Sequence, residues 1–209
     1  MQAGCLLADD INAPCVVIIK HTNPCGVSKN NNLLEAYKKA FMCDPVSVFG
    51  GIIIINGNID KKLAEEISKT FVEIVVGKKI SKEAKNIFQN KKNLILIETK
   101  TFKQFKPKEE IKSMSDAFLI QTPDNFYTKK NNLRFVTKKR LKLKAINNLL
   151  FAEKICKYVK SNAVVLTKDK STIGIGSGQP NRLDSCNLAI DKARKFLSKK
   201  LLNCVAASD

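Results

Sequence analysis

Segments rich in Val and Ile alternate with segments of helical spacing over most of this 209-residue chain. The stretches at 15–20, 52–55 and 72–76 are dominated by β-branched apolar residues, which is typical of strands buried on both faces of a sheet. Between them, 33–41 and 59–71 carry apolar residues at helical intervals. Because helices separate successive strands, we expect an α/β fold with a mostly parallel sheet.

The alternation continues beyond these segments, apart from one looser, lysine-rich stretch at about 99–140 that we interpret as a hairpin or linking arm. We place a subdomain boundary near 140, since the regular pattern resumes there. The further predicted elements are helices at 81–90, 145–159 and 185–197, strands at 94–97 and 162–167, and a hairpin strand at 172–179. The length fits one large or two small domains.

Lys and Arg exceed Asp and Glu by 37 to 19, which gives a formal net charge of +18. Almost all of the cations are lysines, whereas base readout and planar phosphate binding favour arginine, so we disfavour a nucleic-acid partner. We interpret the charge as compositional drift, and the alternative is a field that attracts small anionic substrates. No stretch approaches the roughly 20 apolar residues of a membrane span. The N-terminus lacks the pattern of a secretory leader, so we expect a cytoplasmic protein without membrane contact.

The chain has seven cysteines and a single histidine. No two cysteines are spaced C-x-x-C, and a structural zinc site needs closely spaced Cys or His pairs. We therefore expect no metal, and we expect reduced thiols that act as small apolar side chains. Cys25 follows His21 by four residues, but nothing else in the sequence indicates an activated thiolate.

Lys20 and His21 stand at the end of the first predicted strand. Pro24 and Gly26 predict a turn over 21–26, so both side chains are expected at the carboxyl end of a central strand, where open α/β sheets bind ligands. A lysine ammonium there can stabilise an oxyanion, and an imidazole can transfer protons. The alternative is a structural histidine with no part in catalysis.

Two features lie nearer the end of the chain. Asn162 is a polar residue that opens a predicted buried strand, and the alternative to a catalytic role is a satisfied turn amide. Gly174, Gly176 and Gly178 alternate along a strand, and their spacing matches neither a dinucleotide fingerprint nor a Walker loop. Such glycines indicate the close approach of a flat ligand or of another backbone.

Six segments carry a resemblance to one enzyme family, in the same order along the chain. They lie at 19–26, 44–51, 71–73, 136–138, 160–164 and 172–182. The most specific are Lys-His-Thr-Asn-Pro-Cys-Gly at 20–26 and Ile-Gly-Ile-Gly-Ser-Gly-Gln at 173–179. Together they resemble the 5-aminoimidazole-4-carboxamide ribonucleotide (AICAR) formyltransferase domain of the bifunctional purine-biosynthesis protein, whose other part is inosine monophosphate (IMP) cyclohydrolase.

The resemblance implies transfer of a formyl group from 10-formyltetrahydrofolate, the co-substrate, to the 5-amino group of AICAR, with no metal in the chemistry. It implies that His21 accepts and donates the proton, that Lys20 stabilises the transition state, and that Asn162 is the third catalytic residue. The residues that it implies for substrate binding are Asn23, Phe49, Gly50, Glu73, Gln179, Arg182 and Leu183.

The family's fold implies two cytidine-deaminase-like α/β/α halves, each with three layers. On that basis 1–140 is the first half, with its arm at about 99–140, and 141–209 is the start of an incomplete second half. We expect the cyclohydrolase domain and the end of the folate site to be missing from this chain. The resemblance also implies a cytoplasmic homodimer with a shared active site, and the alternative is an inactive remnant or a ribonucleotide-binding module without turnover.

Overall fold

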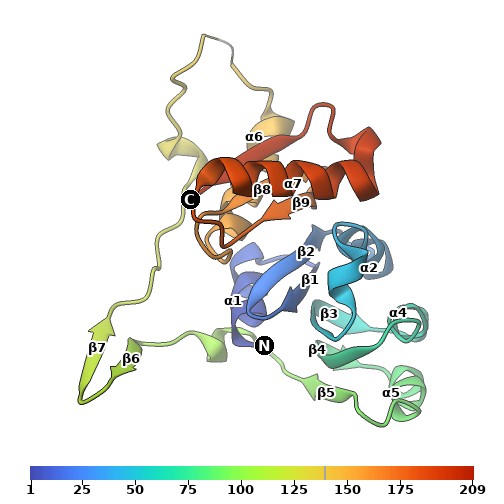
Figure 1. Ribbon diagram of the computed structural model, residues 1–209. Coiled ribbons are helices and arrows are strands. Elements are labelled where there is room, and N and C mark those ends of the chain that lie inside the picture. The colour runs from blue at the N-terminus through green and yellow to red at the C-terminus, as the bar shows by residue number, and fades with distance from the viewer. Residues whose placement is uncertain (139) are drawn as a thin grey trace.

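Helices cover both faces of a mixed eight-stranded sheet in the computed structural model, which describes residues 1–138 and 140–209 (Figure 1). The strands are β1 (Cys15–Lys20), β2 (Asn23–Lys29), β3 (Gly51–Ile59), β4 (Val72–Ile80), β5 (Ile95–Glu98), β6 (Glu110–Met114), β7 (Ala117–Gln121), β8 (Val164–Lys168), β9 (Ser171–Gly176) and β10 (Val205–Ser208). The α-helices are α1 (Gln2–Ile11), α2 (Leu33–Phe41), α3 (Pro45–Val48), α4 (Lys61–Ile67), α5 (Lys82–Gln89), α6 (Leu143–Cys156) and α7 (Arg182–Leu197). Residue 139, in the stretch predicted as an arm, lies outside the described residues.

The strand order is β10-β8-β9-β2-β1-β3-β4-β5. This confirms the α/β class but shows that the prediction of a mostly parallel sheet was wrong. Strands β3, β4 and β5 are parallel, whereas the other pairings of this sheet within the described residues are antiparallel. The reason is that successive strands in two places are joined by a two-residue turn and not by a helix, which reverses the chain direction.

The first of these turns corrects the predicted turn over 21–26. Only His21 and Thr22 form it, with φ of 49° and 67°, and the residues from Asn23 onward belong to β2. The pairing of β1 with β2 shifts its register beside Ile19 and Pro24, where proline has no N–H to donate to a ladder. Pro24 is therefore the second residue of β2 and does not lie inside a loop.

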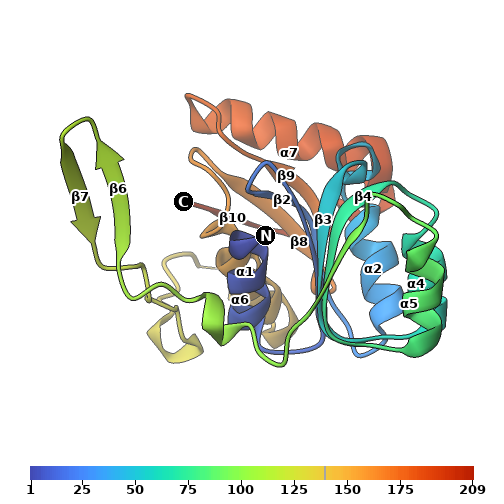
Figure 2. The same cartoon turned by 90° about the horizontal axis from the view of Figure 1, so that it is seen from below.

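The two faces of the sheet bury separate cores, as the alternation of side chains along β1 shows. Val17 and Ile19 pack with α1 and α6, whereas Val16 and Ile18 pack with α2, α4 and α5. Figure 2 shows these helices on opposite sides of the sheet. Helix α7 lies on the same side as α2, and the ion pair between Lys192 and Asp44, at 2.8 Å, ties it to the start of α3. The arrangement is a three-layer α/β/α sandwich.

The order of elements in the first part of the chain recurs in the last part. Helix α1 precedes the β1–β2 hairpin, α2 and then β3, which pairs with β1; helix α6 likewise precedes the β8–β9 hairpin, α7 and then β10, which pairs with β8. The two series meet where β2 pairs with β9. There the hydroxyls of Ser28 and Ser171 lie 2.8 Å apart, and the Thr172 hydroxyl accepts from Val27 N at 2.9 Å.

Strands β6 and β7 form a separate hairpin that stands away from the large sheet, within the lysine-rich stretch (Figures 1 and 2). The chain returns to the sheet through Tyr127, whose hydroxyl donates to Asp10 at 2.6 Å. Tyr158 donates to the second oxygen of the same carboxylate. None of the helices within the described residues has the length and apolar character that would let it cross a membrane.

Candidate active site

The predicted site residues lie along a single edge of the large sheet. At this edge β1 and β9 end, whereas β2, β3, β4 and β8 begin. The predicted residues therefore lie at the carboxyl end of β1, where open α/β sheets bind ligands, but at the amino ends of β3 and β4. Lys20 comes to the same place as Gly50 because β1 runs antiparallel to β3, with Ile19 opposite Ile52.

The loop before β3 is set by a short helix that the sequence pattern did not predict. The Asp44 carboxylate accepts from Ser47 N at 3.1 Å and from the Ser47 hydroxyl at 2.7 Å, and Pro45 begins α3. Burial opposes the charge of Asp44, but hydrogen bonds from Lys192 and Ser47 hold its pKa below the ordinary value. A charged cap thus fixes α3, and α3 delivers Phe49 and Gly50 to the edge.

The Lys20 ammonium is fixed at this loop. Its Nζ donates to the carbonyl oxygen of Phe49 at 2.6 Å. Gly50, next in the chain, has a φ of 68° and donates its N–H to the Phe71 carbonyl at 2.9 Å. A side chain at this φ is strained, so glycine suits the position. Lys20 has further ammonium hydrogens that can point to a ligand.

Two exposed phenylalanines flank Gly50. The rings of Phe49 and Phe71 lie 5.3 Å apart at 49°, and 61% and 45% of these residues are exposed. A Cβ on Gly50 would lie 3.9 Å from Phe71 and 3.9 Å from a carboxylate oxygen of Glu73. Aromatic faces beside a carboxylate and a bare α-carbon can hold a flat, polar ring. Phe71 lies in the 71–73 segment that carries the resemblance, but it was not among the predicted site residues.

His21 presents an exposed imidazole at the turn after β1. Its φ of 49° is a left-handed conformation that histidine adopts more readily than most residues. Within the described part of the chain, no hydrogen bond or ion pair engages its ring, so the imidazole is not held by the fold. It follows Lys20, whose ammonium is fixed, so an ammonium and an imidazole occupy consecutive positions in the chain at the sheet edge.

Asn162 has a structural role that matches the alternative of a satisfied turn amide. Its side-chain Nδ2 donates to the backbone carbonyls of Gln179 at 2.8 Å and Pro180 at 3.1 Å. Its own backbone carbonyl accepts from the Ser185 hydroxyl at 2.6 Å. The side-chain oxygen makes no hydrogen bond within residues 1–138 and 140–209. The amide thus holds the loop before α7 and leaves one acceptor for a ligand.

Arg182 opens α7 and forms an ion pair with Asp209, with Nη2 and Oδ1 at 3.2 Å. The Ser161 hydroxyl, the Ala163 N–H and the Arg182 guanidinium lower the pKa of Asp209 to about 2. Leu183, the next residue, is 70% exposed. Sequence reasoning could not find Asp209, because its position arises only when β10 pairs with β8.

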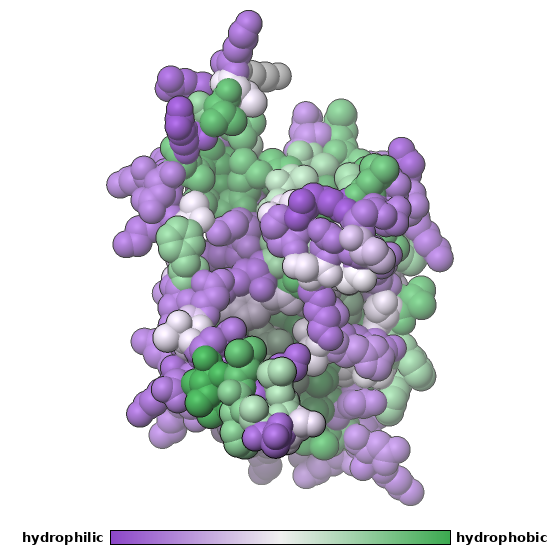
Figure 3. All heavy atoms as spheres, turned by 60° about the vertical axis from the view of Figure 1, so that its left-hand side comes forward, coloured by the Kyte–Doolittle hydropathy of each residue, from purple (hydrophilic) through white to green (hydrophobic). Residues whose placement is uncertain are grey.

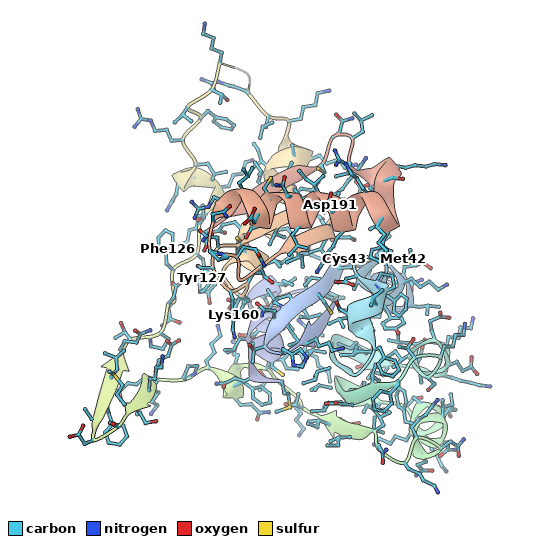
Figure 4. All side chains as sticks on the ribbon, in the orientation of Figure 1. Met42, Cys43, Phe126, Tyr127, Lys160 and Asp191 are labelled. Atoms are coloured by element: carbon cyan, nitrogen blue, oxygen red, sulfur yellow. The ribbon has the colours of Figure 1, made fainter. Side chains whose placement is uncertain are left out.

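A hydrogen bond joins the two groups of predicted residues. Asn23 Oδ1 accepts from Lys160 N at 3.0 Å, which ties the turn of Lys20 and His21 to the segment that leads to Asn162. Lys160 is labelled in Figure 4. The structure therefore brings one group, Lys20, Phe49, Gly50 and Glu73, and a second group, Asn23, Asn162, Gln179 and Arg182, to neighbouring positions on one edge.

The cysteines and acidic residues do not suggest other chemistry at this site. Burial first, then the charges of Cys43 and Asp44, raises the pKa of Cys25 to about 12, which is unsuited to a nucleophile at neutral pH. No group of three His, Cys, Asp or Glu side chains that could hold a metal ion occurs in the described ranges. Besides amides, the edge offers the Lys20 ammonium, the His21 imidazole, and the charged groups of Glu73, Arg182 and Asp209.

Comparison with known proteins gives a match to the family model described as AICARFT/IMPCHase bienzyme, over residues 1–192. The chain is 42% identical over 198 residues to the bifunctional purine biosynthesis protein PurH of Trichodesmium erythraeum, which covers 95% of this chain and 37% of that protein. It is also 42% identical over 208 residues to PurH of a Thermoanaerobacter species, and this match covers 100% of this chain and 40% of that protein. The chain thus spans well under half the length of these relatives.

Among solved structures, a dCMP deaminase from the cyanophage S-TIM5 in apo form resembles part of the chain. The TM-score is 0.37 at 9% identity, over 47% of this chain and 92% of the deaminase. We base no argument on a likeness of this size.

Proposed function

Because the chain belongs to the AICARFT/IMPCHase bienzyme family, we propose that it carries the Lys-His pair for formyl transfer from 10-formyltetrahydrofolate to the 5-amino group of AICAR. The observation that carries the proposal is the adjacency of a fixed ammonium and an unengaged imidazole at one exposed turn. We propose that the whole protein also has the second activity of the family, IMP cyclohydrolase. We also propose that the protein works in the cytoplasm, where thiols stay reduced, in keeping with its seven free cysteines.

The chemistry needs both members of this pair. The aromatic amine of AICAR is a weak nucleophile, so His21 takes its proton as the nitrogen bonds to the formyl carbon. The formyl oxygen then carries negative charge, which the Lys20 ammonium stabilises. When the bond from the formyl carbon to N10 of the folate breaks, the imidazolium returns a proton to that nitrogen. Atoms and charges balance without a metal.

The other residues divide the substrates between the two groups. We propose that the AICAR ring lies against Phe49 and Gly50, with Glu73 accepting from its polar edge, and that Arg182 receives the phosphate in exchange for Asp209. The free oxygen of Asn162 accepts from the reacting amine. The remaining substrate contacts are Leu183 and Gln179 on the folate side and Asn23 beside the turn of Lys20 and His21.

We further propose that the two series of elements are the halves of a deaminase-like pair. Their shared order of helix, antiparallel hairpin, helix and antiparallel strand supports this, and so does the pairing of equivalent strands, β2 and β9, between them. The second series contains fewer strands than the first. The boundary between the halves then falls before α6, close to residue 140.

Formation of formyl-AICAR and tetrahydrofolate, followed by absorbance with both substrates and purified protein that includes the full length of the relatives, tests the proposed activity. We expect turnover that needs both substrates and persists in the presence of a chelator. Saturable binding of AICAR without any turnover, in protein that includes the full length of the relatives, would favour a ribonucleotide-binding module instead.

We propose that the protein is a homodimer and that the β6–β7 hairpin contacts the second copy. Its apolar side chains are exposed on both strands, with Phe118 at 71%, and Figure 3 shows hydrophobic side chains gathered there. The exposed set is Ile111, Met114, Phe118, Leu119 and Ile120. A two-stranded hairpin alone is marginally stable in water, and an exposed apolar patch of this kind marks an interaction surface.

Replacing Phe118 and Ile120 together by aspartate is expected to convert dimer to monomer, because two charges would have to be desolvated in the contact. Sedimentation velocity at several protein concentrations measures the change. The control is Lys108→Asp, which changes the net charge equally on the chain before the hairpin. A double variant that remains dimeric, or a natural chain that is monomeric throughout, would contradict the assignment.

A further inference from the structure

Three lysines line a cavity at the edge of the sheet opposite the candidate active site. Lys29 ends β2, Lys170 lies in the β8–β9 turn, and Lys154 projects from α6. The cavity measures about 390 Å³, which is within the range of small-molecule sites. Nothing in the proposed formyl transfer uses this edge, since Lys20 lies at the other end of the β1–β2 hairpin.

These ammonium groups have no carboxylate partners within the described ranges. Lys154 Nζ donates to the backbone carbonyl of Asp10 at 2.7 Å, and Lys29 and Lys170 have no ion pair there. Burial, followed by the charges of Lys170 and Lys154, lowers the pKa of Lys29. The lysines thus repel one another across the cavity, and an anion between them would remove that repulsion.

The acidic residues that adjoin two of these lysines in the chain are already engaged. Asp169, next to Lys170, pairs with Lys144 at 2.7 Å, and hydrogen bonding to that ammonium lowers its pKa. Glu153, next to Lys154, accepts from the Thr128 hydroxyl at 2.7 Å. Neither carboxylate forms an ion pair with the three lysines, so the positive charge of the cavity is not cancelled by a direct contact.

Lys170 occupies a backbone position that favours glycine. It and Asp169 form a two-residue turn with φ of 55° and 50°, and glycine is the preferred second residue of such a turn. The Lys170 N–H donates to Asn148 Oδ1 at 2.8 Å, and its carbonyl accepts from Lys29 N at 2.9 Å. The turn is therefore held against both α6 and β2. A strained lysine at a fixed place indicates a use for its side chain.

The rest of the cavity lining is uncharged, and most of it is apolar. Leu150 and Phe151 of α6 and Ile11 of α1 give it an apolar floor, and Asn147 adds an amide. We propose that it binds a small phosphomonoester, with the phosphate between the lysines and the organic group on the apolar floor. A bounded cavity with such a floor suits a small molecule better than a nucleic-acid strand, which needs a continuous basic groove.

Titration calorimetry with phenyl phosphate at low salt tests the proposal. We expect one site that Lys29→Gln with Lys170→Gln weakens at least tenfold, and weaker binding of inorganic phosphate, which lacks the ring. The control pair Lys62→Gln with Lys82→Gln removes the same charge from the exposed surfaces of α4 and α5 and should leave the affinity unchanged. Equal affinity in both double variants would overturn the assignment, because binding would then not depend on Lys29 and Lys170. So would binding of an oligonucleotide but not of phenyl phosphate.

Lys170→Gly separates binding from folding. Glycine relieves the left-handed backbone, so we expect the melting temperature to rise by about 2 °C while phenyl phosphate binding falls several-fold. Changes in amide chemical shifts in a ¹H–¹⁵N spectrum locate the bound phenyl phosphate, and we expect the changes at Lys29, Asn147 and Lys170. Unchanged binding in this stabilised variant would show that the lysine is not used for an anion.

Discussion

His21→Ala is expected to lower the turnover of formyl transfer by about 10²- to 10⁴-fold, the usual contribution of a positioned acid–base group. The imidazole makes no hydrogen bond within the described residues, so its removal leaves no buried group without a partner, and we expect the fold to lose only about 1 kcal/mol from alanine in the left-handed turn. Lys20→Ala is expected to cost about 10²- to 10³-fold through loss of oxyanion stabilisation. Steady-state rates at saturating AICAR and 10-formyltetrahydrofolate measure both effects.

Two comparisons separate chemistry from structure in this experiment. Lys20→Arg keeps the charge beside the Phe49 carbonyl and should retain more activity than Lys20→Ala, whereas Lys62→Ala removes an exposed lysine from α4 and should be neutral. Circular dichroism and melting temperature check that each variant is folded. Near-normal turnover in His21→Ala would remove the proposed proton transfer, and near-normal turnover in Lys20→Ala would remove the proposed oxyanion contact.

The positions of the strands and helices were largely predictable, because they depend on local pattern. The strand at 15–20 and the helix at 33–41 have the predicted bounds, since apolar spacing and the Asn32 cap act within a few residues. The helix predicted at 59–71 is shorter, because Asp60 caps it and β3 continues through Ile59. Helix α1 was not predicted, since its start has no side-chain cap.

Strand direction was predicted correctly for the β8–β9 hairpin but not for β1 and β2. The turn at His21 and Thr22 contains neither glycine nor asparagine, which are the usual signals of a two-residue hairpin, and Pro24 suggested a longer loop. The β2–β9 pairing, which joins segments more than a hundred residues apart, has no local signal at all. This pairing places Asn23 beside Lys160 and so unites the site.

The site residues could be found one by one but not their contacts. Lys20 was singled out because it ends an apolar strand at the edge where open α/β sheets bind ligands, and Asn162 because it is a polar residue that opens a buried strand. That Lys20 donates to Phe49, and that Arg182 pairs with Asp209, depends on which strands are neighbours. Sequence reasoning also left open whether the alternating glycines serve a ligand or a backbone, and the structure decides this for two of them.

Gly174 and Gly176 face the backbone of α7. A Cβ on Gly176 would lie 1.8 Å from the Ser185 carbonyl oxygen, and one on Gly174 would lie 2.1 Å from that of Ala189. Gly178 has a φ of 68° but open space around it. The first two glycines therefore allow close packing of a helix on a strand, and the third only permits a backbone conformation.

Gly176→Ala is accordingly expected to destabilise the fold by about 3 kcal/mol or more, because α7 must move as a whole to relieve a clash with backbone. For a chain of this size that lowers the melting temperature by roughly 6–12 °C. Gly178→Ala, with strain but no clash, is the matched control and should lower stability by only about 1 kcal/mol. The Ser185 hydroxyl holds the Asn162 carbonyl at 2.6 Å, so a displaced α7 also moves Asn162 and Arg182. Activity should then fall in Gly176→Ala even at temperatures where the protein is folded, and equal melting temperatures for the two variants would show that the close contact is not needed.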